Sequence, residues 1–90
     1  YSITGIIEDI SNSIDIFPNP TKNIVNTYFY NSSITIITII NVIGDKIMSV
    51  TTSRKGKNKI EFNLSKFSSG IYFVQFETEL GIVNRKLVLE

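Results

Sequence analysis

The stretch IEFNLSKFSSGIYFVQFET, residues 60–78, contains two strand-like segments that are joined by a polar corner. In both segments every second residue is apolar, and successive side chains of a strand point to opposite faces. The apolar positions are Ile60, Phe62, Leu64, Tyr72, Val74 and Phe76. Between them, Ser65–Gly70 is polar and ends in glycine, as turns do. The stretch therefore predicts strands at 60–64 and 71–78, each burying one face in a common core.

The rest of the chain repeats this pattern of short strands separated by turn residues. The further strands that it predicts are 13–17, 23–30, 33–43, 46–52 and 82–89, with a tight reversal at Gly44-Asp45. Seven short strands without a helical pattern are typical of an all-β fold. We expect a single antiparallel β-sandwich, immunoglobulin-like, of about seven strands.

Segment 33–43 (SITIITIINVI) departs from simple alternation because it is apolar on both faces. Its two faces carry Ile34, Ile36, Ile40 and Val42 on one side and Ile37 and Ile39 on the other. A strand that is apolar on both faces is buried on both. We therefore expect a central strand whose second face is covered by a loop, a neighbouring domain or a partner.

Length and composition indicate one domain without the usual chemistry of thiols or imidazoles. The chain has 90 residues, 42% of them hydrophobic, with no cysteine, no histidine and a net charge of +1. A chain of this length forms one domain with a thin core, which we place at residues 13–90. Residues 1–12 are interpreted as a linker or the tail of an upstream domain, since the sequence begins with Tyr1 and looks like a piece of a longer protein.

The sequence predicts a domain that is not an enzyme and that holds no metal or cofactor. Without cysteine and histidine, disulfides, thiolate zinc and the commonest general base are excluded. The carboxylates are scattered, and the serines have no base to activate them. The near-neutral charge gives no reason to expect nucleic acid binding. The basic cluster at 54–59 is interpreted as a solvated turn and a secondary contact for anions.

Two prolines interrupt the strand pattern near the beginning, in FPNPT at 17–21. Pro18 and Pro20 have no N–H to donate to a sheet, and each one restricts the residue before it. The segment is therefore expected to be a stiff connector that ends one strand and directs the next. Asn19 is expected to add a local hydrogen bond from its side chain to the backbone.

Three blocks of sequence, taken in order, resemble one known family. These blocks contain Pro18, Asn19 and Pro20, then Asn41, Gly44 and Lys46, and then Leu64, Ser65, Phe67, Ser69, Gly70, Ile71 and Tyr72, followed by Lys86 in the last strand. In this order and at this spacing they resemble the type A C-terminal sorting domain of proteins that Bacteroidetes export through the type IX secretion system. The departures are Phe17 for a usual tyrosine, Phe67 for a usual leucine, and Glu90 where many members end in lysine or arginine.

The resemblance implies a delivery signal rather than a catalyst. Such a domain follows a cargo domain and carries it from the periplasm across the outer membrane, to be secreted or held at the cell surface. The implied partners are the outer-membrane translocon and a sorting peptidase, which removes the signal. The recognition residues implied by the motif are Pro18, Asn19, Pro20, Asn41, Gly44, Lys46, Leu64, Gly70, Tyr72 and Lys86.

Other interpretations of the same residues remain open. Segment 82–89 would lie at a sheet edge, where a translocon strand could pair with it or where two copies could exchange strands. The main alternative function is a carbohydrate-binding or spacer sandwich of a secreted hydrolase or adhesin. Carbohydrate binding would require an exposed platform of aromatic side chains, whereas the aromatic residues here mostly alternate into the core and tryptophan is absent.

Overall fold

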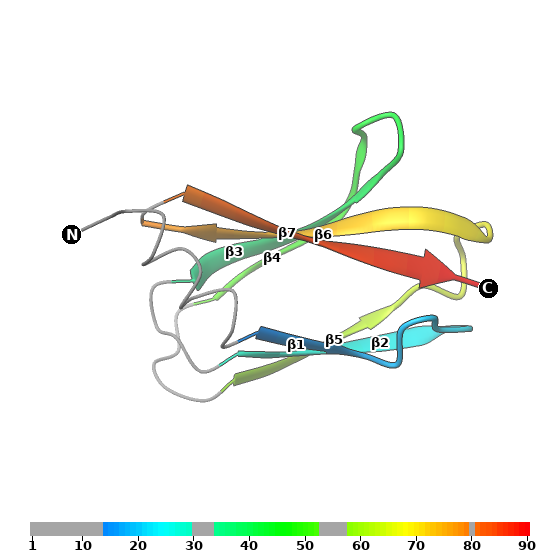
Figure 1. Cartoon of the computed structure of the whole chain (residues 1–90), viewed down its shortest axis with the longest axis horizontal. Helices are drawn as coiled ribbons and strands as arrows, with labels where there is room; N and C mark the ends of the chain where they lie inside the picture. The colour runs from blue at the N-terminus through cyan, green and yellow to red at the C-terminus, as the bar shows by residue number, and fades with distance from the viewer. Residues whose placement is uncertain (1–13, 30–33, 53–57, 80) are drawn as a thin grey trace.

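The computed structural model describes residues 14–29, 34–52, 58–79 and 81–90 (Figure 1). The strands are β1 (Ile14–Phe17), β2 (Ile24–Phe29), β3 (Ile34–Asn41), β4 (Lys46–Thr51), β5 (Asn58–Asn63), β6 (Gly70–Thr78) and β7 (Gly81–Leu89). All seven predicted strands are confirmed, with bounds that shift by one or two residues. The proposed linker 1–12 and most of the basic cluster at 54–59 lie outside the described residues.

The strands form two antiparallel sheets that face each other as the two layers of a sandwich (Figure 1). One sheet has the order β1-β2-β5, and the other has the order β4-β3-β6-β7. In the constant-type immunoglobulin sandwich the fourth strand pairs with the fifth. In this protein β4 pairs with β3 instead. The described part of the chain contains no helix with the length and apolar character needed to cross a membrane.

The core lies between the sheets and is built from the alternating positions that the sequence predicts. Its buried hydrophobic residues are Ile14, Val25, Phe29, Ile34, Ile37, Ile39, Phe62, Leu64, Tyr72, Val74, Phe76, Val83, Leu87 and Leu89. Three phenylalanines, Phe29, Phe62 and Phe76, are its largest fully buried side chains. Since a fully buried aliphatic or aromatic side chain contributes roughly 1.5–3 kcal/mol, these few residues supply most of the stability of a thin core.

Strand β3 lies between β4 and β6, as its apolar character predicts. Ile37 and Ile39 point into the core, and a shift in register between Ile34 and Ile36 also places Ile34 there. Ile36 and Ile40 remain partly exposed on the outer face of the sheet. The prediction that Val42 belongs to this strand is wrong, because the strand ends at Asn41 and Val42 lies in the turn that follows.

Candidate functional site

The three sequence blocks, far apart in the chain, lie at the same end of the sandwich. In the register of the larger sheet, Asn41 is opposite Tyr72 and Gly70 is opposite Leu89. Thr21, at the end of the proline connector, forms an isolated parallel bridge with Leu89. Figure 1 shows this end at the C-terminus, while β1 begins at the other end of the molecule. We refer to the end that carries the three blocks as the motif end.

The proline connector is attached to the edge of β7. The Asn19 side chain donates from Nδ2 to the Lys86 carbonyl (2.8 Å) and accepts at Oδ1 from the Val88 N–H (3.0 Å). Thr21 donates its N–H to the Val88 carbonyl (2.9 Å) and accepts from the Glu90 N–H (2.8 Å). The prediction of a local bond from Asn19 is wrong, because the amide of this side chain pairs with β7 much as a peptide group would.

This attachment changes the interpretation of the last strand. The sequence predicts that segment 82–89 is an open edge, yet the connector occupies that edge from Lys86 to Glu90. The peptide bonds before Pro18 and Pro20 are both cis. Through its hydrogen bonds to β7, the connector joins the two sheets along one side of the sandwich, and it also links β1 to β2.

The second block forms the turn between β3 and β4. The Asn41 side chain accepts at Oδ1 from the N–H groups of Ile43 (3.1 Å) and Asp45 (2.9 Å). Gly44 has a φ of 90°, a conformation that residues with a Cβ rarely adopt. The turn is longer than the predicted Gly44-Asp45 reversal, since it spans residues 42–45. Asn41 and Gly44 thus build a turn that leaves Val42 68% and Ile43 78% exposed.

The third block forms the corner between β5 and β6. Leu64 is fully buried and donates its N–H to the Asn23 carbonyl (2.7 Å). The Tyr72 hydroxyl donates to the Ser68 carbonyl (2.6 Å), four residues upstream. A tyrosine near the start of the sixth strand that bonds back to this corner is the tyrosine corner of immunoglobulin-like folds. Leu64 and Tyr72 therefore hold the corner in place from the core side.

We expect Tyr72→Phe to destabilise the domain by about 1–2 kcal/mol, because the hydroxyl bond to Ser68 is lost in a partly buried corner. Urea unfolding of the purified domain measures the change. Tyr28→Phe is the matched control, because it removes the hydroxyl from another partly buried ring and keeps the ring that stacks on Phe17, and it should stay within about 0.5 kcal/mol. Equal effects of the two variants would contradict the role of the corner.

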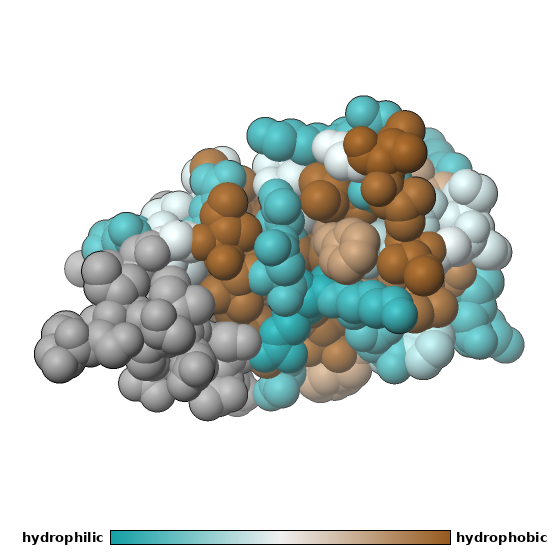
Figure 2. Space-filling view, turned by 45° about the horizontal axis from the view of Figure 1, so that its top comes forward, coloured by the Kyte–Doolittle hydropathy of each residue, from teal (hydrophilic) through white to brown (hydrophobic). Residues whose placement is uncertain are grey.

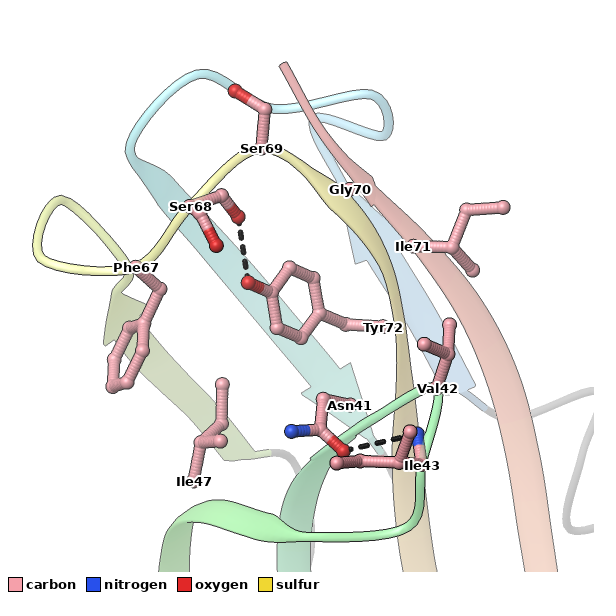
Figure 3. A pocket seen from close by; sticks show the side chains of 10 residues that line it. All are labelled: Asn41, Val42, Ile43, Ile47, Phe67, Ser68, Ser69, Gly70, Ile71 and Tyr72. Atoms are coloured by element: carbon pink, nitrogen blue, oxygen red, sulfur yellow. Dashed lines mark hydrogen bonds between the residues drawn. The ribbon is translucent and has the colours of Figure 1, made fainter.

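The turn and the corner line an open pocket of about 350 Å³ at the motif end (Figure 3). Its lining residues are Asn41, Val42, Ile43, Ile47, Phe67, Ser68, Ser69, Gly70, Ile71 and Tyr72. Most of the wall is apolar, and polar groups come from the Asn41 amide and the two serines. Figure 2 shows that apolar residues are exposed on the face of the molecule turned toward the viewer. The pocket is suited to an apolar side chain of a partner that offers hydrogen bonds at its margin.

Most of the ten predicted recognition residues therefore determine the structure of the turn, the corner and the connector at the motif end, and are uncharged. Lys46 and Lys86 are the two charged residues among them, and both are exposed. The ten do not include the apolar residues Val42, Ile43, Ile47 and Ile71, which line the pocket, although Ile71 belongs to the third block. The signal that could have indicated Val42 and Ile43 is a pair of β-branched residues directly before the glycine of a turn. Within the described ranges, no three acidic side chains lie close enough together to hold a metal ion.

The fold, its tyrosine corner and the adjacent pocket define a β-sandwich module of the immunoglobulin-like class. A family model described as "Secretion system C-terminal sorting domain" matches residues 15–90, and the chain belongs to this family. The family is that of the C-terminal sorting domains of type IX secretion, so the resemblance of the three blocks is confirmed. No curated protein matches the sequence.

Family membership establishes the coarse function of the chain. The domain is a C-terminal sorting signal for type IX secretion, which implies interaction with the type IX machinery and with an attached cargo. It also implies delivery to the cell surface or the exterior.

Proposed function

We propose that residues 13–90 act as one non-catalytic signal that takes a cargo protein, attached on its N-terminal side, from the periplasm across the outer membrane. The translocon binds the motif end of the sandwich. The observation that carries this proposal is the convergence of the three family blocks at one end, beside an open apolar pocket. Pockets of this kind, with few polar groups, are typical binding sites.

The direction of the chain supports this arrangement. Strand β1 begins at Ile14, whose partner in the sheet is Phe29, at the end of the sandwich opposite the motif end (Figure 1). The described part of the chain therefore begins at the end opposite the pocket, which favours attachment of the cargo on that side. A folded cargo in that position would not block the surface that the translocon contacts.

Removal of the signal after export fits the same layout. A sorting peptidase acts most readily on a chain segment that lies outside the folded core. Cleavage before Ile14 would free the cargo without breaking any strand of the described sandwich. The cargo would then be released or attached to the cell surface.

The carbohydrate-binding alternative gains one observation from the structure. The sequence predicts that the aromatic residues mostly turn inward, yet Phe17 is 50% exposed and stacks on Tyr28, with ring centroids 4.7 Å apart. The Lys59 ammonium lies 5.8 Å from the centroid of the Tyr28 ring. Phe17 and Lys59 already contact the ring of Tyr28. A sugar could therefore stack on little more than the free face of Phe17. The alternative is therefore the second candidate function.

A transplant tests the proposed function. Residues 12–90 are fused to the C-terminus of a fluorescent protein with a Sec leader and produced in a Bacteroidetes strain that has a type IX system. We expect fluorescence in the medium or on the cell surface, and its loss in a strain without the translocon. Fluorescence that stays in the periplasm of both strains, with the fusion folded, would overturn the proposal, and glycan arrays would then test the second candidate.

A further inference from the structure

The two long sides of the sandwich differ in how well the core is closed. On the side of β1 and β7, the proline connector bonds to β7, and Arg85 donates from Nη2 to the Ile14 carbonyl (3.2 Å). The other side lies between the edge strands β4 and β5. Most of the described apolar side chains that are only partly buried against the core lie there, namely Ile47, Met48, Val50, Ile60 and Phe67, whereas Ile16 lies on β1. We call these five residues and the space between their strands the open seam.

The topology explains the open seam. In the constant-type immunoglobulin order, the fourth strand pairs with the fifth and covers its edge. In this protein β4 pairs with β3 instead, which leaves one edge of β4 and one edge of β5 unpaired among the described strands. The two free edges lie on the same side of the sandwich.

Edge strands of natural sheets carry features that prevent pairing with other chains, such as short length, charge, proline or a covering segment. Strand β1 is short and is followed by Pro18. The proline connector covers the second half of β7, and β5 carries Lys59 and Glu61. Strand β4 begins with the exposed Lys46, and the six residues that follow, 47–52 (IMSVTT), contain no charge and no proline. Beyond Lys46, the edge of β4 therefore has no charge, no proline and no covering segment among the described residues.

The backbone of β4 can accept a further strand. Thr52, directly after β4, donates its N–H to the carbonyl of Thr35 in the neighbouring strand β3 (2.7 Å). Backbone groups two residues apart point the same way, so those of Val50 and Met48 also face β3. The N–H and C=O groups of Ser49 and Thr51 therefore point toward the open seam.

We propose that β4 is a strand-addition site for an extended segment of the export machinery that is apolar at alternate positions. The segment forms a sheet ladder with Ser49 and Thr51, and its apolar side chains cover Met48, Val50 and Ile60. An uncharged edge beside a row of apolar side chains calls for a segment of this chemistry, since strand addition takes affinity from main-chain bonds and specificity from alternate side chains. Ile47 and Phe67 also line the pocket, so the seam continues the proposed binding surface. The inference thus rests on the proposed function.

The test uses two proline variants in the fluorescent fusion. Ser49→Pro removes an N–H that faces the seam, and an edge strand tolerates proline where its N–H faces outward. Asn84→Pro is the matched control, because Val88 and Lys86 bond outward from β7 and Asn84 shares their orientation. Ser49→Ala measures how much of any change in export comes from loss of the Ser49 hydroxyl, which lies 3.2 Å from the hydroxyl of Thr38. Urea midpoints establish that each variant is folded.

We expect Ser49→Pro to lower export about tenfold or more, which corresponds to the loss of one or two interface hydrogen bonds, and Asn84→Pro to leave it unchanged. Equal export by Ser49→Pro and the unaltered fusion would overturn the β4 site and leave the proposed function intact, since the unaltered fusion is still exported. Loss of export in Asn84→Pro alone would instead assign the site to β7. Failure of the unaltered fusion to be exported would overturn both proposals.

If Ser49→Pro does not fold, hydrogen–deuterium exchange tests whether β4 is the strand-addition site. The unaltered domain is compared alone and with the purified type IX translocon as the probe. We expect added protection in the peptides that cover β4. Binding with protection only at β7 or only at the motif end would overturn the β4 site. A dimer of the unaltered domain in light scattering, with β4 protected in the absence of the translocon, would show that the occupant is a second copy and not the machinery.

Discussion

Replacing Val42 and Ile43 together by aspartate should lower export of the fluorescent fusion at least about tenfold. These two side chains are the most exposed large apolar residues among those described, and both line the pocket. Buried apolar anchors at an interface commonly contribute more than about 1 kcal/mol each, and 1.4 kcal/mol corresponds to a factor of ten. Cell fractionation followed by fluorescence measures the exported share.

The stability of this double variant should remain within about 0.5 kcal/mol of the original, because both side chains are exposed in the folded domain. Ile82→Asp is the matched control. Ile82 is 53% exposed on β7 and does not line the pocket. If the control lowers export as much as the double variant does, added negative charge and not the pocket would explain the loss.

Leu64→Ala should reduce the free energy of unfolding by about 2–5 kcal/mol. Leu64 is fully buried and lies at the point where β5 ends and the corner begins. Removing its side chain leaves a cavity in a core that has few other residues to fill it. Since small domains are stable by only about 5–15 kcal/mol, this variant should lose much of its stability. Urea unfolding and a thermal melt measure the change.

Ser65→Ala is the control for Leu64→Ala within the same sequence block. Ser65 is exposed, and its N–H, which donates to Asn63 Oδ1 (3.0 Å), is kept in the variant. Its effect should stay within about 0.5 kcal/mol. Should Leu64→Ala keep its stability and lose export, the machinery would read this position directly, and our interpretation of the block as structural would fail.

These two predictions distinguish the structural role of the family blocks from the contact role of the exposed residues beside them. Asn41, Gly44, Leu64 and Tyr72 determine the shape of the turn and the corner. The side chains that these elements present, above all those of Val42 and Ile43, are the ones that a partner can reach. A sequence pattern can therefore identify a sorting domain through residues such as Leu64, which is fully buried.

Strand positions and the apolar core could be predicted from the sequence because they depend on local alternation. Phe62 and Leu64 point inward since two residues of a strand return a side chain to the same face. The polar corner between them and Tyr72 was also evident from composition. The order of the three family blocks indicated the family, and the family model confirmed it over residues 15–90.

The tertiary structure alone decided which edges are covered and which side chains meet. The partner of Asn19 is β7, more than sixty residues away in the chain, and no local pattern encodes that pairing. The position of β4 beside β3, which opens the seam, likewise follows from the choice between two possible neighbours. Alternation determines the face on which a side chain lies, whereas the packing of distant strands determines what that face or edge contacts.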